Sequence, residues 1–417
     1  MFHELFESDL DSSNLAKHCT TFQDTPIIGA KDYVGIYQKP DAETPLIYLP
    51  HGFPNPNDLS EIQLRKKLTT LIRVIIRSKR ELRLKGNDIF QGNDHAEFPF
   101  DSFYRVILDY LQYGLLLEPE RKESIFGSGR NQWAKTLRKN QPFWTEQGPV
   151  HLHPIRIRTV YTQLELMEIQ EYCLMLSDRH IGWLFGRRMP LEITWNSVKI
   201  MKAIRYVESA KSQTFNERKT NLLRDMEVIL KKKFDGTIKK ENNFTLGIKD
   251  YMAHVWENMV EVVFGAGVDS RNNPRAKWYL EDGSMKDANG DMRLDSIRVD
   301  EIASEKICSV IDSKYYIPGK LPATSDINKQ ITYGEWVNAK TEGIYSKVQN
   351  IFIMPKNLVK KDSEYIGYAT MGILQDLAKP YHKIHVVYIN TYSLMTWYLR
   401  KDRSHAERIC HKHTQNW

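Results

Sequence analysis

The chain has 417 residues, of which 41% are hydrophobic and 11% aromatic, and its 59 Lys and Arg outnumber its 52 Asp and Glu. This length exceeds one ordinary hydrophobic core and predicts two or three domains, while the apolar content excludes an extensively disordered chain. The formal net charge of +7 is modest, and it favours a polyanionic partner only if the cations cluster on one surface.

The cysteines and the hydropathy pattern indicate the compartment. The four cysteines are widely spaced and form no CxxC pair, which argues against a disulfide framework or a zinc ribbon. The first 14 residues are acidic and lack the order of a signal peptide, and no segment approaches the roughly 20 apolar residues of a membrane helix. We therefore expect a soluble, cytoplasmic protein.

The N-terminal part combines a short lead-in with a basic helix. Residues 1–58 hold short apolar runs broken by Pro and Gly, which predict short strands and loops. From 59 to 84 the apolar residues recur at helical spacing, in a stretch rich in Lys and Arg. Such a row of cations is typical of a solvated helix face, but it also suits the spacing of phosphates. We take Arg73, Arg77 and Arg80 as candidate DNA contacts.

A second group of cations follows the amphipathic helix predicted at 99–117. Residues 125–144 contain closely spaced glycines, but the GK[ST] ending of a phosphate-binding loop is missing, which excludes an NTP site here. Basic residues lie beside Trp133 in this segment. We expect an anchoring loop in which Arg130 and Lys135 contact DNA.

The middle of the chain is expected to be helical, at 160–187 and 190–234. The polar, Gly-containing segment 234–244 then marks a domain boundary. The expected parts are a lead-in at 1–58, a mainly helical DNA- or partner-binding region at 59–240, a mixed α/β domain at 245–400, and a basic, frayed tail at 401–417. The His and Cys residues of that tail match no zinc module.

The C-terminal domain carries acidic residues and a lysine in a defined order. Residues 248–265 predict an amphipathic helix, and Asp295 lies where a strand begins after a polar stretch. The run 306–317 is rich in β-branched and aromatic residues and predicts a buried strand carrying Asp312 and Lys314. Because residues i and i+2 of a strand share a face, these two side chains are expected to point the same way.

This pattern suits hydrolysis of a phosphodiester bond. Mg²⁺ takes oxygen ligands, which Asp295 and Asp312 would supply, and Mn²⁺ would substitute for it. The metal polarises the phosphate and lowers the pKa of a bound water. Lys314 would orient or activate that water and offset charge on the phosphoryl oxygens. We expect a metal-dependent nuclease core of the PD-(D/E)xK type, with Asp291 and Asp300 as alternatives to Asp295.

Three further residues extend the candidate site. Glu257 lies on the preceding helix, where it would face the metal as a third acidic ligand or hold the lysine. Gln330 and Tyr333 lie at the start of the following helix, where they would brace the site and contact DNA. The alternative is that the DxK pair is a surface salt bridge, Glu257 a solvated charge and Gln330 a surface amide.

Several sequence blocks resemble one restriction family in their order. They are WEN at 256–258, LDS at 294–296, VIDSKYY at 310–316 and DINKQITY at 326–333, preceded by GSGRNQWAKTLRKNQP at 127–142. Together they resemble the LlaJI family of restriction endonucleases, whose nuclease half is similar to the McrC subunit of the McrBC system. The resemblance covers about 125–400, and it departs from the superfamily name at Leu294, which stands in place of proline.

The resemblance implies a sequence-specific or modification-dependent DNA restriction component in host defence. Such components often work with a separate AAA+ subunit that hydrolyses GTP or ATP, and the absence of any NTP-binding motif in this sequence agrees with that division. Because a double-strand break needs two active sites, a homodimer or larger assembly on DNA is expected. Two alternatives remain: a recombination, repair or transposition nuclease of the same fold, and a catalytically silent DNA-binding subunit.

Overall fold

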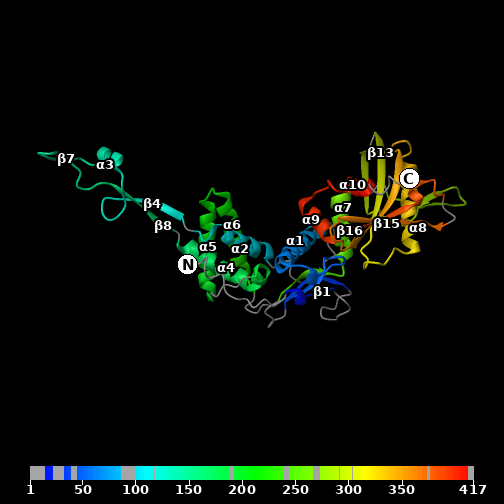
Figure 1. The fold of residues 1–417 in the computed structure, drawn as a ribbon, viewed down its shortest axis with the longest axis horizontal. Coiled ribbons are helices and arrows are strands. Elements are labelled where there is room, and N and C mark those ends of the chain that lie inside the picture. Colours follow the sequence, from blue (N-terminus) through cyan, green and yellow to red (C-terminus); the bar gives the residue numbers. More distant parts are fainter. Residues whose placement is uncertain are drawn as a thin grey trace. The chain divides into compact units, whose positions relative to one another are not determined.

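The computed structural model describes most of the chain, and it divides into two compact units. The described residues are 15–21, 32–38, 45–85, 99–116, 118–162, 164–186, 192–238, 244–265, 273–290, 292–302, 304–372 and 376–411. One unit comprises Met1–Leu10 with Glu97–Asn242, and the other Asp11–Ala96 with Asn243–Trp417. Helices and strands occur in both (Figure 1), so the expected mixed α/β class is confirmed.

The second unit is built around a five-stranded sheet in the order β12-β13-β14-β16-β15. The three central strands β13, β14 and β16 run parallel, and the edge strands β12 and β15 are antiparallel to their neighbours. β13 and β14 are buried along most of their length, as their runs of Val, Ile and Phe predict. The strands are β12 (Ser296–Ile302), β13 (Glu305–Ser313), β14 (Lys347–Lys356), β15 (Ser363–Ala369) and β16 (Ile384–Asn390).

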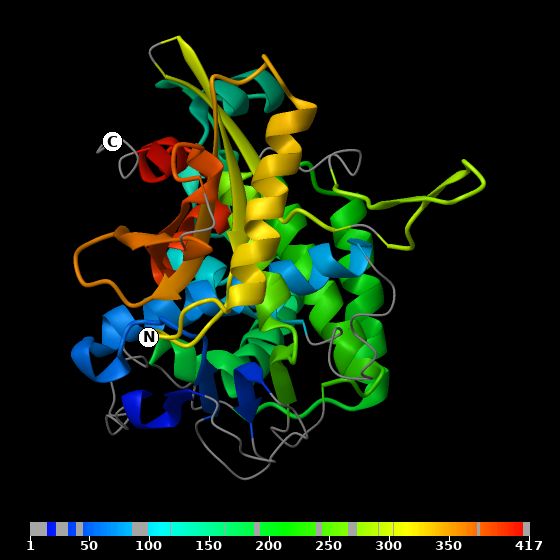
Figure 2. The same ribbon diagram turned by 90° about the vertical axis from the view of Figure 1, so that its right-hand side faces the viewer.

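Helices cover both faces of this sheet. Figure 2 shows α8 lying over the strands, where Tyr333 and Val337 of the helix pack with Cys308 and Val310 of β13. On the opposite face, Gln349 of β14 donates to a carbonyl of α10, and α7 packs against α9. The helices are α7 (Met252–Phe264), α8 (Thr324–Lys340), the short η6 (Pro380–His382), α9 (Thr391–Arg400) and α10 (Ala406–His411).

A hairpin of two short strands, β10 (Lys277–Tyr279) and β11 (Met285–Asp287), lies between α7 and β12 in the sequence. Both of its strands are exposed throughout. It therefore contributes nothing to the core of the sheet.

The second unit also contains a smaller sheet of order β1-β3-β2-β9, which joins the lead-in to the start of the C-terminal domain. A Cβ placed on Gly247 of β9 would lie 2.3 Å from the Tyr33 ring of β2, so only glycine allows this close approach. The elements are η2 (Leu15–His18), β1 (Cys19–Thr21), β2 (Tyr33–Gln38), β3 (Leu46–Leu49), η3 (Pro56–Asp58) and β9 (Phe244–Lys249).

The basic helix predicted at 59–84 is α1 (Glu61–Lys85), and it packs against α9 and β9. Its buried side chains include Leu68, Ile72 and Ile75, as the helical spacing predicts, whereas Ile62 is 82% exposed. Because α1 belongs to the same compact unit as the large sheet, the region expected at 59–240 is divided between the two units.

The first unit contains a group of helices in which α2, α4, α5 and α6 pack together. The helical stretch expected at 190–234 is interrupted by a turn between α5 and α6. Asp225 of α6 is buried and accepts hydrogen bonds from Ser102 and Arg105 of α2, which ties these two helices. The helices are α2 (Phe100–Tyr113), α4 (Leu164–Phe185), α5 (Ser197–Ser212) and α6 (Glu217–Phe234).

Between α2 and α4 the chain forms short strands rather than continuing as helix. β8 pairs with β4 and β5, and β6 pairs with β7, so this part of the expected helical region is mostly β-structure. The elements are β4 (Glu118–Ser124), β5 (Arg130–Asn131), α3 (Trp133–Lys139), β6 (Phe143–Thr145), β7 (Gly148–Val150) and β8 (Arg156–Thr162).

The expectation of a frayed tail at 401–417 is wrong for its described part. Residues 406–411 form α10, in which Ile409, Cys410 and His411 are buried. His411 Nε2 lies 2.7 Å from Asp300 Oδ2, which anchors this helix to β12. Among the helices described, none combines the length and apolar character that crossing a membrane requires.

Candidate active site

The two predicted aspartates lie at the same end of the β12–β13 pair. Asp295 immediately precedes β12, and Asp312 is the second-last residue of β13. The antiparallel register places Ser296 opposite Ile311, so Asp295 and Asp312 lie next to each other at the same end of this strand pair. The backbone N–H and the hydroxyl of Ser313 both donate to Asp295 Oδ2, at 3.0 and 3.2 Å, and orient that carboxylate.

Lys314 follows β13 and is held between two carboxylates. Its backbone N–H donates to the carbonyl of Ile353 at 2.9 Å, which extends the strand pairing past Asp312. Its Nζ lies 2.8 Å from Asp312 Oδ2 and 3.0 Å from Asp326 Oδ1. The structure therefore brings the i and i+2 side chains together, as the strand periodicity predicts.

Asp326 of α8 fixes the ammonium of Lys314 and was not singled out from the sequence. Its Oδ2 accepts hydrogen bonds from the Tyr316 hydroxyl at 3.0 Å and from the backbone N–H of Ala323 at 3.1 Å. Asp326 thus closes the first turn of α8 with one oxygen and binds the lysine with the other. Its place at the start of a predicted helix was the available signal.

The acidic residues of the site repel one another. Burial, together with the nearby charges of Asp295 and Asp312, raises the pKa of Glu257 on α7 to about 7. Burial and the charge of Asp295 raise the pKa of Asp312, which is only 2% exposed, and Lys314 opposes that rise. Such mutual repulsion is typical of carboxylates gathered to receive a cation.

Two lysines offset part of this negative charge. Burial lowers the pKa of Lys314, but the carboxylates of Asp312 and Asp326 outweigh it and leave that pKa raised. Lys329 of α8 is a second cation, and its Nζ lies 5.3 Å from the centre of the Tyr333 ring. Burial lowers the pKa of Lys329 too, but Tyr333 and Asp312 raise it above its usual range. Lys329 was missed from the sequence, although it lies four residues before Tyr333 on the same helix face.

Gln330 and Tyr333 brace the site from α8. Gln330 Nε2 donates to the carbonyl of Val310 at 2.9 Å and to Asn350 Oδ1 at 3.2 Å, so it links the helix to β13 and β14. The Tyr333 hydroxyl donates to the carbonyl of Arg293, just before Asp295. Both side chains are buried, at 1% and 0% exposure, so the expectation that Tyr333 contacts DNA is corrected to a structural role.

The cations proposed on α1 differ in their surroundings. Arg77 donates to the carbonyls of Tyr398 and Leu399 at 2.7 and 3.2 Å and pairs with Glu81 at 2.7 Å. It therefore satisfies the C-terminal carbonyls of α9, and its candidate role in DNA contact is corrected. Arg73 and Arg80 are exposed on the same helix.

The other proposed DNA contacts lie in the first unit. Arg130 is exposed on β5, and Lys135 of α3 pairs with Glu123 of β4. The same segment exposes large aromatic side chains, among them Trp133 and Trp144, which are 53% and 74% exposed. The expected combination of cations and aromatic rings is therefore present on this surface.

Asp300 does not replace Asp295 as an acid of the site. It lies at the other end of β12, where Arg298 Nη2 approaches its Oδ1 to 2.6 Å and His411 Nε2 approaches its Oδ2 to 2.7 Å. Both oxygens are thus occupied. Asp291, the other alternative, lies outside the described residues.

The donor set at Asp295, Asp312 and Glu257 fits a hard divalent cation in its chemistry. All three supply carboxylate oxygens, and their repulsion would be relieved by a bound cation. Within the described ranges, no group of three or more His, Cys, Asp or Glu side chains is already arranged as a metal cage. The residues present thus match magnesium in type, with Lys314 beside Asp312 where positive charge is needed.

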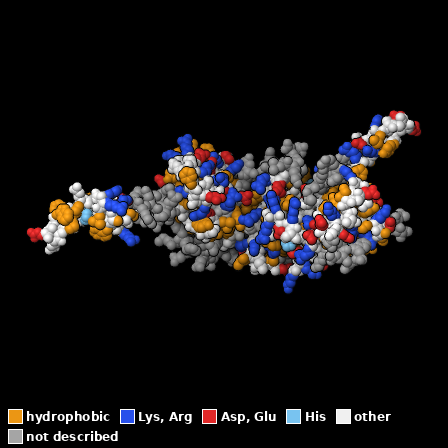
Figure 3. All heavy atoms as spheres, turned by 90° about the horizontal axis from the view of Figure 1, so that it is seen from above, with side chains coloured by type: hydrophobic (Ala, Val, Ile, Leu, Met, Phe, Trp, Pro, Cys, Tyr) orange, Lys and Arg blue, Asp and Glu red, His pale blue; other side chains and the backbone are white. Residues whose placement is uncertain are grey.

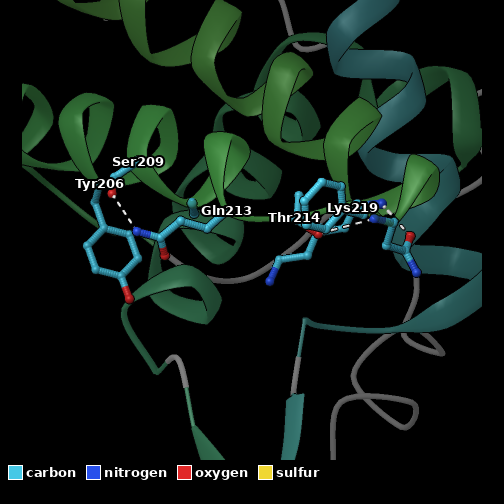
Figure 4. Close-up of a pocket in the computed structure, with 8 residues that line it drawn as sticks. Tyr206, Ser209, Gln213, Thr214 and Lys219 are labelled. Atoms are coloured by element: carbon cyan, nitrogen blue, oxygen red, sulfur yellow. Dashed lines mark hydrogen bonds between the residues drawn. The ribbon is translucent and has the colours of Figure 1, made fainter.

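A cavity of about 570 Å³ lies elsewhere, at the turn between α5 and α6 (Figure 4). Its lining includes Tyr206, Gln213, Thr214 and Lys219, and none of the candidate nuclease residues. The acidic site therefore lies at the ends of β12 and β13 and is separate from this cavity.

Comparison with known protein families identifies the family of this chain. The model of the LlaJI restriction endonuclease family matches residues 34–391. This chain belongs to the LlaJI restriction endonuclease family, and the resemblance noted from the sequence is confirmed. No curated protein matches the chain.

Four chains of solved structures also match. One comes from a half-complex of a tetradecameric assembly of Thermococcus gammatolerans McrB AAA+ hexamers with bound McrC. It is 13% identical with a TM-score of 0.31, and the match covers 88% of this chain and 81% of that one.

Proposed function

We propose that this chain is the nuclease subunit of a restriction system and hydrolyses phosphodiester bonds of double-stranded DNA with Mg²⁺, in host defence. The observation that carries the proposal is the meeting of Asp295, Asp312 and Lys314 at one end of β13. Family membership supports the reaction class. The core of residues 245–400 is accordingly proposed to be of the PD-(D/E)xK type.

Each residue of the site has a chemical task in this proposal. Asp295, Asp312 and Glu257 would hold Mg²⁺ or Mn²⁺, which when bound polarises the phosphate and acidifies a water. Lys314 keeps its proton, because the carboxylates of Asp312 and Asp326 raise its pKa. A protonated lysine donates hydrogen bonds to phosphoryl oxygens and offsets the charge that develops there, which favours this role over that of a general base.

The remaining surfaces are proposed to bind DNA and a partner. Arg73 and Arg80 on α1, with Arg130 and Lys135 in the first unit, would contact the DNA backbone. Exposed aromatic side chains near Trp133 support a protein partner there, which we propose is an AAA+ NTPase subunit using GTP or ATP. Cleavage of both DNA strands then requires a homodimer or larger assembly.

Plasmid cleavage with Mg²⁺ tests the proposal. Wild type and Lys314→Ala are compared, each with and without the co-encoded NTPase and GTP or ATP, on modified and unmodified DNA. Lys361→Ala is the matched control, because Lys361 is exposed on a loop of the same unit. We expect wild type and the control to linearise DNA, and Lys314→Ala to bind DNA without cutting it.

The other outcomes assign the alternatives. If no protein cuts under any condition, the chain is a silent DNA-binding subunit. Equal cutting by wild type and Lys314→Ala would place the active centre elsewhere. Cleavage that requires branched or nicked DNA, with no methyltransferase gene beside this one, would favour a recombination or repair nuclease.

A further inference from the structure

The β10–β11 hairpin is a projecting element that begins beside the candidate active site. Its base is closed by hydrogen bonds from Ala288 N–H to the carbonyl of Ala276 and from Met292 N–H to that of Pro274. Leu294 N–H donates to Asn273 Oδ1 at 3.2 Å, directly before Asp295. The hairpin is thus joined to the segment that carries Asp295 and leads into β12.

The hairpin exposes apolar side chains on both faces. Trp278 and Lys286 are cross-strand neighbours on one face, and Tyr279 and Met285 are neighbours on the other. Trp278 is 64% exposed, Tyr279 79% and Met285 55%. An isolated two-stranded hairpin is marginally stable, and large exposed aromatic groups mark a contact surface. The ribbon therefore has the character of a contact surface.

The hairpin carries cations on its stem and most of its acidic side chains in its turn. Figure 3 shows it projecting at the upper right, with basic side chains towards its base and acidic ones at its tip. Lys277 and Lys286 are exposed on the stem, and Glu281 and Asp282 lie in the turn. The stem also carries Asp287, which is opposite Lys277 and lies 3.4 Å from Arg275. Asp282 Oδ1 accepts from the Ser284 N–H at 2.8 Å, so this carboxylate closes the turn. The stem combines aromatic rings with cations, as surfaces that bind nucleic acid do.

We propose that the β10–β11 hairpin enters a groove of the DNA beside the scissile phosphate and contributes to recognition of the target. The proposal rests on the nuclease function proposed above. The major groove is about 12 Å wide and admits a two-stranded β-ribbon. Trp278 and Tyr279 would contact base edges, and Lys277 and Lys286 would bind phosphates on either side.

Chain length sets how far the hairpin reaches. Lys286 precedes Asp295 by nine residues. At roughly 3.3 Å per residue, the aromatic stem lies at most about 30 Å from the first acid. One turn of DNA is about 34 Å long, so the hairpin reads base pairs within about one turn of the cut.

A second copy of this chain is a less suitable occupant. Residues 277–287 comprise the whole hairpin, which is 11 residues. Stable protein interfaces use roughly 20–30 residues a side. DNA, by contrast, must already lie across Asp295 and Asp312 for the proposed reaction, so the stem is continuous with the surface that DNA occupies.

DNA binding and cleavage by two hairpin variants test this inference. The full chain is titrated against a labelled duplex of about 40 base pairs, or some four helical turns, by fluorescence anisotropy. Trp278→Ala/Tyr279→Ala is compared with Tyr368→Ala, since Tyr368 is a 51% exposed aromatic side chain on the edge strand β15. We expect the double variant to lose about tenfold or more in affinity, and the control to remain within about twofold.

A charge variant adds a readout that folding alone does not change. Lys277→Ala/Lys286→Ala should lower the slope of log Kd against log salt by about two, because each lost phosphate contact removes about one. Lys360→Ala/Lys361→Ala on another exposed loop should leave the slope unchanged. Unchanged affinity, salt slope and cleavage pattern in both hairpin variants would overturn the inference.

The outcomes separate this inference from the nuclease proposal. Hairpin-dependent binding by a wild type that never cuts would uphold the hairpin and overturn the nuclease. Normal cutting by the hairpin variants would do the reverse. If the variants lose only self-association, seen by light scattering, while each chain still binds DNA normally, then a second copy covers the hairpin and the inference is wrong.

Discussion

The β12–β13 pair carries a buried carboxylate towards each end, and the surroundings of the two carboxylates differ. At one end, the pKa of Asp312 is raised by burial and by the neighbouring charge of Asp295. At the other end, burial also acts to raise the pKa of Asp300, but hydrogen bonds from His411 and Arg298 outweigh it and leave that pKa lowered. The same strands thus hold one carboxylate with a raised pKa, Asp312, and one with a lowered pKa, Asp300.

The difference shows how a functional site is told from a structural one. Arg298 and His411 saturate both oxygens of Asp300, so this cluster joins β12 to α10 and has no capacity left for a ligand. Asp312 and Glu257 repel each other and still need positive charge. A structural ion pair lowers the energy of the folded chain by itself, whereas the repelling carboxylates do so only with a cation bound.

The largest expected effect is at Asp312. Asp312→Asn should lower the cleavage rate at least about 100-fold, because it removes a proposed metal ligand. It should also leave the melting temperature unchanged or raise it at pH 8, since it removes a carboxylate whose charged form is disfavoured by burial. Cleavage assays and thermal unfolding on one preparation check both. A large fall in melting temperature would contradict the comparison.

The reverse pattern is expected at Asp300. Asp300→Asn should destabilise the folded chain by about 3 kcal/mol, because it leaves Arg298, whose side chain is only 15% exposed, without its charged partner. Cleavage by the protein that remains folded should match wild type. Urea unfolding, followed by cleavage well below the transition, measures the two quantities. A loss of activity as great as that of Asp312→Asn would mean that Asp300 belongs to the site.

Adding Mg²⁺ tests the difference between the two ends of the β12–β13 pair through the stability of the folded chain. At a concentration 100 times its Kd, Mg²⁺ should stabilise wild type by about 2.7 kcal/mol through binding to the folded state alone. Asp295→Asn should lose this stabilisation, and Asp300→Asn should keep it on a lower baseline. Thermal shift with and without Mg²⁺ is the measurement. Equal shifts in all three proteins would place the metal elsewhere.

The smallest expected effect is at Asp326, which positions Lys314. Asp326→Asn should lower the cleavage rate about tenfold and move the alkaline limb of the pH profile to lower pH, because the carboxylate raises the pKa of the lysine. Glu335→Gln on the same helix is the control, since Glu335 pairs with His382 instead. A rate loss without a shift of the profile would indicate a purely structural role.

How much of the site could be predicted depended on the range of the interaction. The pairing of Asp312 with Lys314 follows from strand periodicity, which needs only two residues of local sequence. Asp326 and Lys329 lie in the segment 326–333, which resembles the family, yet their roles depend on how α8 packs over β13. Arg77 was misassigned because nothing in its own helix shows that α9 ends beside it.

In the fold, too, local features could be predicted from the sequence and long-range contacts could not. Local apolar spacing predicted the core strands and helix α1, but it did not predict that β9 pairs with β2, some 200 residues earlier in the chain. Nor did it show that α10 packs on the sheet, because that packing depends on Gln349, which donates to the carbonyl of Cys410, and on Asp300, which contacts His411. The short strand β5 was missed, since its two residues, Arg130 and Asn131, are polar and exposed.

By itself, the sequence determined the mixed α/β class, the family, and the order in which the acids and the lysine occur, because these are properties of local pattern. Only the tertiary structure decided which acids meet, since Asp295 reaches Asp312 through the register of two antiparallel strands. It also decided that Asp300 is neutralised and that Tyr333 is buried. Charges change their chemistry with burial and neighbours, and both are set by contacts between segments distant in the chain.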